Sequence, residues 1–361
     1  MFSPLVIIAG GVLLLVLLVA ILRGLVSRQT PRLTDLIEPS WRASHGHRPE
    51  LLRHVRRRFI GLIVVAVLAA ASCLIWQAAA PRLGGLPVVV LPVMVWLAVM
   101  VAWSAWPWPA PDADSAVTHA ATAEAAATSP SAPPQTHADL LHRGWTTFGP
   151  KWSFLFPGAL LALLVFGLTA AGLTSVEDES GRLRQLGYRS FGGAELDESG
   201  LVTQVLQSVG ATGPYPGWYY GVVILALAFA AAAASLIVLW RNTRRVRPYD
   251  YRLFRLDNGV RAAVAYTVAT LSAAFISAQA AVVALMTATA QFSAAQRTRF
   301  VVGQPIDAAN LTFDPQFLTA AIMMLAIAVV LTVVAVLLAA SCVRRMRQAF
   351  GTAAPQPRDH A

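Results

Sequence analysis

Two clusters of carboxylate residues lie between residues 177 and 198 of the sequence. Carboxylates can serve in both metal binding and catalysis. The clusters are Glu177, Asp178 and Glu179, and Glu195, Asp197 and Glu198. Carboxylate oxygens hold divalent cations and act as general acids and bases, so these residues could bind a cation or a basic partner, or serve a membrane enzyme. Charge solvated in an exposed loop is the favoured interpretation.

Histidine offers a second chemistry, metal binding. His45 and His47 form an HGH motif with His54 nearby, and His137 and His142 stand on either side of Asp139. Imidazole nitrogens bind transition metals, but solvated loop residues are again the favoured interpretation. We therefore predict no metal ligand, no cofactor and no cofactor-binding residue.

The common catalytic motifs are missing from the sequence. Lys151 is the only lysine and follows Pro150, so the Gly-Lys pair of a phosphate-binding loop cannot form. The sequence also lacks G-x-S-x-G, H-E-x-x-H and C-x-x-C. We predict that the protein is not an enzyme and assign no catalytic residue.

The composition indicates what kind of elements carry these residues. Hydrophobic residues make up 57% of the 361-residue chain and charged residues 13%, which is typical of integral membrane proteins. Seven apolar stretches reach the ~20 residues needed to cross a bilayer as a helix. They are 4–22, 59–80, 86–106, 154–174, 218–240, 262–290 and 317–342. The predicted fold class is all-α, a polytopic bundle of seven transmembrane helices.

Arginines predict the orientation of this bundle. With the N-terminus outside and the C-terminus in the cytoplasm, 22 of the 28 Lys and Arg lie on the cytoplasmic side, as the positive-inside rule requires. The topology-determining residues are Arg56, Arg57, Arg58, Arg244, Arg245, Arg344 and Arg345. Because these clusters border membrane spans, we interpret them as cytoplasmic helix ends and predict no nucleic-acid partner.

The chain divides into two membrane units. Residues 1–107 hold three spans and a basic cytoplasmic loop, 23–58, and residues 138–361 hold four spans. Between them, residues 108–137 are rich in Ala, Pro and Thr and predict a disordered cytoplasmic linker. The second unit has extracytoplasmic loops over 175–217 and 291–316.

Two local patterns predict structure at the outer side. In 201–209, apolar residues recur at i, i+1, i+4, i+5 and i+8, which predicts a short amphipathic helix. At the start of the seventh span, Asp314 is placed to cap a helix and Pro315 to occupy its first position.

The sixth span carries the most polar side chains at membrane depth. Small residues recur every seven positions along 262–290, which favours close packing against another helix. Thr267, Thr270, Ser277 and Gln279 stand in this span. They predict either a helix-packing seam, which is the favoured interpretation, or the lining of a solute path.

One segment resembles a known group of proteins. The stretch "FGPKWSFLFPGALLALLVFGLTAAGLTSVEDESGRLR" is similar to the corresponding stretch of uncharacterised polytopic membrane proteins from actinobacteria. It shares an aromatic entry, an apolar span and an acidic outer loop. The resemblance implies a bacterial membrane setting and carries over no activity and no site residue.

Taken together, these features predict a multi-pass protein of the cytoplasmic membrane. The leading hypothesis is a non-catalytic accessory or permease-like subunit, with the lipid bilayer and another membrane or ATPase subunit as partners. The alternatives are a stand-alone transporter or channel for a neutral or apolar solute, and a membrane enzyme that uses the extracytoplasmic carboxylates.

Overall fold

The computed structural model describes residues 50–107, 151–245, 254–299, 302, 304 and 310–350. The predicted first span, 4–22, and the predicted linker, 108–137, lie outside the described residues, as do His45, His47, His137 and His142. All statements below concern the described part of the chain.

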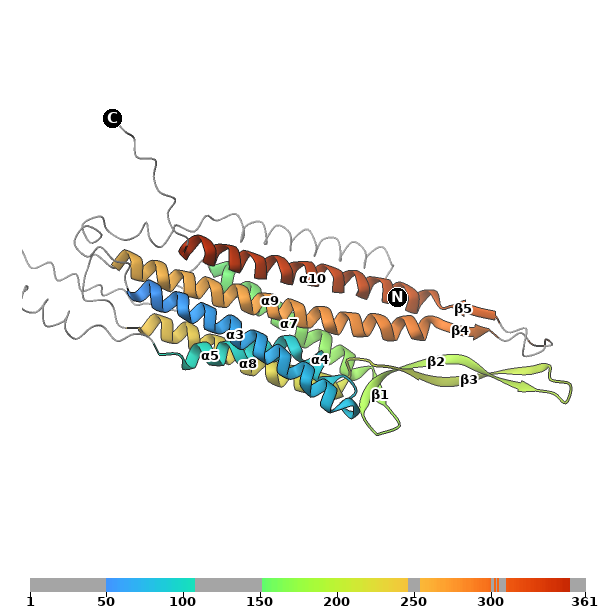
Figure 1. The fold of residues 1–361 in the computed structure, drawn as a ribbon. Coiled ribbons are helices and arrows are strands. Elements are labelled where there is room, and N and C mark those ends of the chain that lie inside the picture. Colours follow the sequence, from blue (N-terminus) through green and yellow to red (C-terminus); the bar gives the residue numbers. More distant parts are fainter. Residues whose placement is uncertain are drawn as a thin grey trace, which may run out of the picture.

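Long helices lying side by side form the body of the molecule (Figure 1). They are α3 (Glu50–Ala79), α5 (Leu91–Ala105), α7 (Lys151–Leu173), α8 (Trp218–Arg244), α9 (Phe254–Ala295) and α10 (Pro315–Phe350). Five of them, α3, α7, α8, α9 and α10, are long and apolar enough to cross a membrane. The predicted multi-pass helical membrane protein is therefore confirmed.

The surface of the bundle also fits a lipid environment. Large apolar side chains point outward along whole helices, among them Ile63 and Ile75 of α3 and Val329 and Val336 of α10. Apolar surface of this extent is typical of proteins solvated by hydrocarbon and is rare on soluble monomers.

The predicted span 86–106 is not one continuous helix. Its chain forms a four-residue helix, α4 (Leu86–Val89), is interrupted at Val90, and continues as α5. Pro92 contributes to the interruption because it has no N–H to donate to the carbonyl of Val88. Before α4 lie a short 3-10 helix (Pro81–Leu83) and the left-handed residues Gly84 (φ 59) and Gly85 (φ 84).

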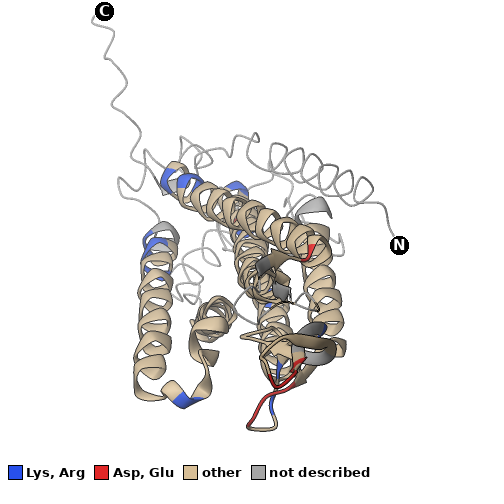
Figure 2. Ribbon diagram, turned by 90° about the vertical axis from the view of Figure 1, so that its right-hand side faces the viewer, with Lys and Arg blue, Asp and Glu red and all other residues tan. Residues whose placement is uncertain are grey.

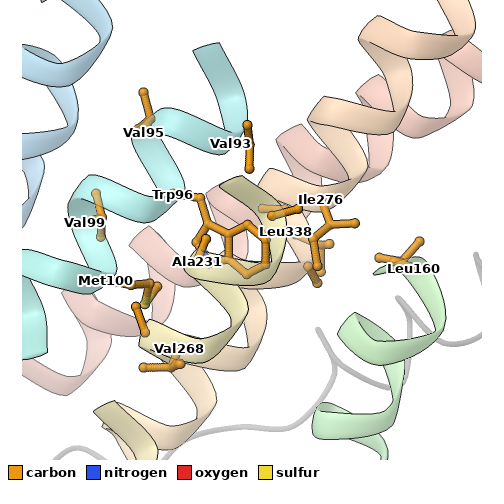
Figure 3. Close-up of a cluster of buried hydrophobic side chains, with 14 of the residues drawn as sticks. Val93, Val95, Trp96, Val99, Met100, Leu160, Ala231, Val268, Ile276 and Leu338 are labelled. Atoms are coloured by element: carbon orange, nitrogen blue, oxygen red, sulfur yellow. The ribbon is translucent and has the colours of Figure 1, made fainter. Parts of the chain in front are cut away.

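α9 is the central helix and is much longer than its predicted span. It has 42 residues, or about 63 Å at 1.5 Å per residue, and contacts α10, α7, α8 and α5. α5 packs between α8 and α9, and one apolar core joins helices from both sides of the predicted linker. Figure 3 shows Trp96 of α5 pointing toward Ala231 of α8 inside this core.

α10 begins as the sequence predicts. Asp314 Oδ1 accepts hydrogen bonds from the N–H groups of Gln316, at 2.8 Å, and Phe317, at 3.4 Å, and Pro315 is the first helical residue. This cap supplies partners to two of the donors that a helix N-terminus leaves unsatisfied.

Two of the connections at one end of the bundle are β structure. β1 (Ser175–Glu177), β2 (Leu183–Leu196) and β3 (Val202–Thr212) form an antiparallel sheet in the order β1-β2-β3. A second antiparallel pair joins β4 (Gln296–Arg299) to β5 (Asn310–Phe313). The long β2–β3 hairpin, which we call the arm, projects away from the helices (Figure 1).

The predicted amphipathic helix over 201–209 is wrong, because this segment lies in β3. Its apolar spacing fits a helical period, but Val202, Thr203 and Val205 are β-branched and favour a strand. Pairing with β2 favours the strand over the helix. The two strands pair along their length, from Leu196 opposite Val202 to Leu186 opposite Thr212.

Candidate functional site

The polar contacts between side chains lie in three places: the two ends of the helix bundle and one layer between these ends. The arginine-rich end is where α3 and α9 begin and α5, α8 and α10 end. The hairpin end carries the strands, and Figure 2 shows the acidic residues gathered there. The layer between holds the polar residues of α9.

The four polar residues predicted in the sixth span do not share one face of α9. At 100° per residue, Thr270 and Gln279 lie about 180° apart, whereas Thr270 and Ser277 lie about 20° apart. The side that bears Thr267 faces α10, since the Thr267 hydroxyl is hydrogen-bonded to the thiol of Cys342. Gln279 lies about 120° around the helix from Thr267 and faces the junction of α4 and α5, where it contacts Val89.

Gln279 binds the backbone at the interruption between α4 and α5. Its Nε2 donates to the carbonyl oxygen of Val89 at 3.0 Å, and the side chain is 1% exposed. This bond satisfies a carbonyl that the interruption of the helix leaves inside the protein. Gln279 Oε1 has no hydrogen-bond partner among the described residues.

A second polar cluster lies two turns away on the same face of α9. Trp96 Nε1 donates to the hydroxyl oxygens of Ser235 and Ser272, at 3.2 Å each, and the Ser235 hydroxyl donates to the carbonyl of Ala231 at 2.8 Å. These bonds join α5, α8 and α9. Together with the Gln279 contact they form a seam of neutral polar groups within an apolar core.

A buried ion network holds the arginine-rich end of α8 and α9. Arg261 Nε donates to Asp257 Oδ2 at 2.8 Å, and its Nη atoms donate to the carbonyls of Asn242, Thr243 and Arg245 at 2.9, 3.0 and 2.6 Å. Asp257 also pairs with Arg245. Arg261 and Asp257 are 0% and 1% exposed. One guanidinium thus satisfies three carbonyls at the C-terminal end of α8.

This network was not predicted, because every charged residue lies outside the predicted spans. The signal was available, since Asp257 and Arg261 stand at i and i+4, the spacing at which opposite charges meet on a helix. Nothing in the sequence, however, indicates that the pair is buried against the end of α8.

The predicted topology-determining arginines fall into two groups. Arg58 donates to the carbonyls of Trp103 and Trp106, and with Arg241, which donates to Ser104, it closes the end of α5. Arg245 belongs to the ion network, and Arg244 and Arg345 lie over the rings of Trp240 and Tyr266 at 4.4 and 3.8 Å. The remaining three, Arg56, Arg57 and Arg344, are exposed.

The two carboxylate clusters contain the same tetrapeptide, Asp-Glu-Ser-Gly, at 178–181 and 197–200. In both turns the aspartate N–H donates to the carbonyl four residues on, and the glycine N–H donates to the aspartate carbonyl. Gly181 (φ 71) and Gly200 (φ 80) adopt the left-handed conformation that such turns need. This repeat is the clearest signal for hairpins in the sequence, and it was not recognised there as one.

The aspartate side chains are occupied in holding these turns. The N–H of Arg182 donates to Asp178 Oδ1 at 2.9 Å, and Arg184 pairs with Oδ2. The Arg182 N–H, with Arg184 and the Ser180 N–H, holds the pKa of Asp178 below its usual range. The Ser199 hydroxyl and the Leu201 N–H do the same to the pKa of Asp197.

Side chains from the arm and from α8 anchor the connection before α4. The hydroxyl of Tyr220 donates to the carbonyl of Gly84 at 2.6 Å, and Arg182 Nη1 donates to the carbonyl of Arg82 at 3.0 Å. Arg184 lies so close to Gly84 that a Cβ there would clash with its guanidinium. The base of the arm is thereby tied to the start of α4.

Metal-binding chemistry is not assembled in the described ranges. They contain no group of three or more His, Cys, Asp and Glu placed to hold a metal ion. His54 Nε2 instead lies 3.1 Å from the carbonyl oxygen of Pro107, beside the arginines that close α5.

Comparison with known proteins adds no relative. No family model, no curated protein and no solved structure matches this chain.

Proposed function

We propose that this protein is a non-catalytic subunit of a membrane complex, of the accessory or permease-like kind. The observation that carries the proposal is the arm. β2 has 14 residues, which corresponds to about 46 Å at 3.3 Å per residue, and the hairpin leads away from the helices (Figure 1). A long hairpin held outside the core offers its surface to a second chain.

The distal part of the arm has features that suit docking. Leu196 and Leu206 are 44% and 38% exposed, although the helix core lies beyond their reach. β3 is an edge strand of its sheet, and its Val202 N–H donates to the backbone carbonyl of Gln304 at 2.9 Å. This bond is backbone pairing at a sheet edge, the mode by which an extended segment of a partner chain would also dock.

The proposed setting is the cytoplasmic membrane of a bacterium, with the arginine-rich end in the cytoplasm and the arm outside. The basic residues at the ends of α3, α8 and α10 support this orientation through the positive-inside rule. The proposed partners are the bilayer and another membrane or ATPase subunit, and nucleic acid is not among them.

The test is a mild-detergent pull-down of the tagged full chain from its native membrane, with co-purifying chains quantified by mass spectrometry. The expected result is a chain in stoichiometric amount. A preparation that contains only this protein would contradict the subunit proposal.

A matched variant assigns the contact to the arm. Arg189 pairs with Val209, so residues 190–208 can be replaced by a second copy of the Asp-Glu-Ser-Gly turn. The shortened arm keeps Asp178 and Arg184 at its base. We expect that the partner no longer co-purifies with the shortened protein, although the protein still inserts into the membrane. If the partner still co-purifies, it must contact the helices instead of the arm. The Glu198→Gln variant, which keeps the arm at full length, is the control.

A stand-alone transporter or channel for a neutral or apolar solute is the second candidate. The helix interruption at Val90 and the buried amide of Gln279 favour it, since discontinuous helices often form solute sites in membrane proteins. Flux of a neutral solute such as glycerol into vesicles that contain only this protein would support it. Flux that is the same in empty vesicles would remove it.

A further inference from the structure

The last turns of α8 carry two exposed arginines beside an exposed indole ring. The guanidinium of Arg244 lies over the ring of Trp240 at 4.4 Å, and Trp240 is 51% exposed. Arg241 and Arg244 are both exposed. At 100° per residue, Arg244 lies about 40° from Trp240 and about 60° from Arg241 around the helix. The three side chains therefore share one side of α8.

Apolar side chains continue this side of α8 toward the middle of the helix. Val222, Phe229 and Leu236 lie within about 40° of Trp240 around the helix and are 56%, 55% and 56% exposed. From Phe229 to Arg244 the helix rises about 22 Å. One leaflet of a bilayer, headgroups included, has a thickness of about 20–22 Å. An acyl chain that lies along this stripe therefore places its headgroup beside the arginines.

The charges around Arg241 favour an anion at this place. Arg241 Nη1 donates to the carbonyl of Ser104, but a guanidinium has several N–H donors and this side chain is exposed, so donors remain for a second acceptor. Arg58 also donates to the last turn of α5, and its charge repels that of Arg241. An anion beside Arg241 would reduce this repulsion.

The dipole of α8 opposes an anion only weakly. The C-terminal end of a helix carries partial negative charge on its last carbonyls, which disfavours a second negative group. At the end of α8, however, the guanidinium of Arg261 donates to three of these carbonyls. The attraction of the two exposed arginines for an anion is therefore the larger effect.

We propose that Arg241, Arg244 and Trp240 bind the phosphate of an anionic phospholipid whose acyl chain lies along the exposed apolar stripe of α8. Guanidinium groups donate charge-assisted hydrogen bonds to phosphate, and the indole ring keeps the Arg244 plane oriented. The inference goes beyond the proposed subunit role, because a lipid binds with or without a partner chain. It requires only that α8 crosses a bilayer.

The experiment measures lipid binding to the full chain, purified in a neutral detergent and freed of lipid. Native mass spectrometry compares phosphatidylglycerol, which is anionic, with phosphatidylcholine of the same acyl chains, which is neutral. We expect tighter binding of phosphatidylglycerol. Arg241→Gln and Arg244→Gln should each weaken it about fivefold, the contribution of one arginine near an anionic headgroup, and leave phosphatidylcholine binding unchanged.

Arg344→Gln is the matched control, because it removes one exposed arginine from the same end of the bundle but from α10. It should leave the affinity for phosphatidylglycerol nearly unchanged. An equal weakening by Arg344→Gln and Arg244→Gln would show a general attraction of this end for anionic lipid and would overturn the proposal. Unchanged affinity in Arg244→Gln would overturn it as well.

Inorganic phosphate distinguishes a lipid headgroup from a soluble phosphate compound. It lacks an acyl chain, so at the same concentration it should not displace phosphatidylglycerol, and displacement would overturn the assignment to a lipid. Arg244→Gln removes no backbone contact, and its unfolding midpoint in lipid-free detergent should stay close to that of the native protein. A loss of phosphatidylglycerol binding at an unchanged midpoint would support the site.

Discussion

The arginine-rich end and the hairpin end satisfy the backbone in different ways. At the arginine-rich end, α5 and α8 present the carbonyls of their last turns, and the guanidinium groups of Arg58, Arg241 and Arg261 donate to them. At the hairpin end, the chain continues into strands that pair with each other, Asp178 and Asp197 hold the turns, and Asp314 caps α10. The positive charges of the first end are therefore structural, because they satisfy these carbonyls and also complement the helix dipoles.

The comparison would fail if the buried Arg261 contributed no more to the free energy of unfolding than the exposed Arg244. Arg261→Ala should cause the largest loss, about 3–5 kcal/mol of unfolding free energy, because it leaves carbonyls of α8 without donors and Asp257 with less compensation. Arg244→Ala, which removes only the contact with Trp240, is the control, with a loss of about 1 kcal/mol or less. Unfolding of both variants by a denaturing detergent measures the difference; equal losses would contradict it.

The helix interruption should show an intermediate effect. Gln279→Leu removes the donor to the Val89 carbonyl, and we expect a loss of about 1–2 kcal/mol in the same assay. Ser277→Ala is the matched control, because its buried hydroxyl has no partner among the described residues. If the two variants lose equal stability, the Gln279 contact contributes nothing specific.

Asp178 and Asp197 sharpen the comparison within the hairpin end. Asp178→Asn should lower the midpoint of global unfolding, because Asp178 holds Arg184 at the base of the sheet. Asp197→Asn should leave this midpoint unchanged and increase amide exchange only near the tip of the arm. Hydrogen exchange with mass spectrometry resolves the two regions, and a global effect of Asp197→Asn would argue against an independent arm.

The smallest effect is expected from acid. The pKa values of Asp178 and Asp197 are lowered in the folded protein, so their contribution is present above the unfolded value and is lost as pH falls through the folded one. Amide exchange in the β1–β2 turn and at the tip of the arm, corrected for intrinsic rates, should rise below about pH 4. The double variant Asp178→Asn/Asp197→Asn should lack this rise.

The sequence allowed the membrane helices to be predicted because a long apolar run has one stable solution in a bilayer. The sequence did not reveal the interruption at Val90. Pro87 and Pro92 stand near its ends, but prolines are also common in the first turn of uninterrupted helices. The strand β3 was missed because its apolar spacing fits two periods, and only its partner β2 decides between them.

The candidate site was predictable only in its residue types. The sequence identified Gln279 and the Thr/Ser row, but their separation onto two faces of α9 depends on where α10 and α4 pack. Asp257 and Arg261 were missed because the burial of an ion pair depends on the elements that pack around it, here the end of α8.

The pairing of β2 with β3 makes the length of the arm adjustable in fixed steps. Side chains alternate between the two faces of a strand, so removal of two residues from each strand shortens the reach by about 7 Å and keeps every remaining side chain on its face. Removal of one residue from each strand exchanges the faces beyond that point. A family of arms cut in steps of two would measure how far from the helices the contact surface of the proposed partner lies.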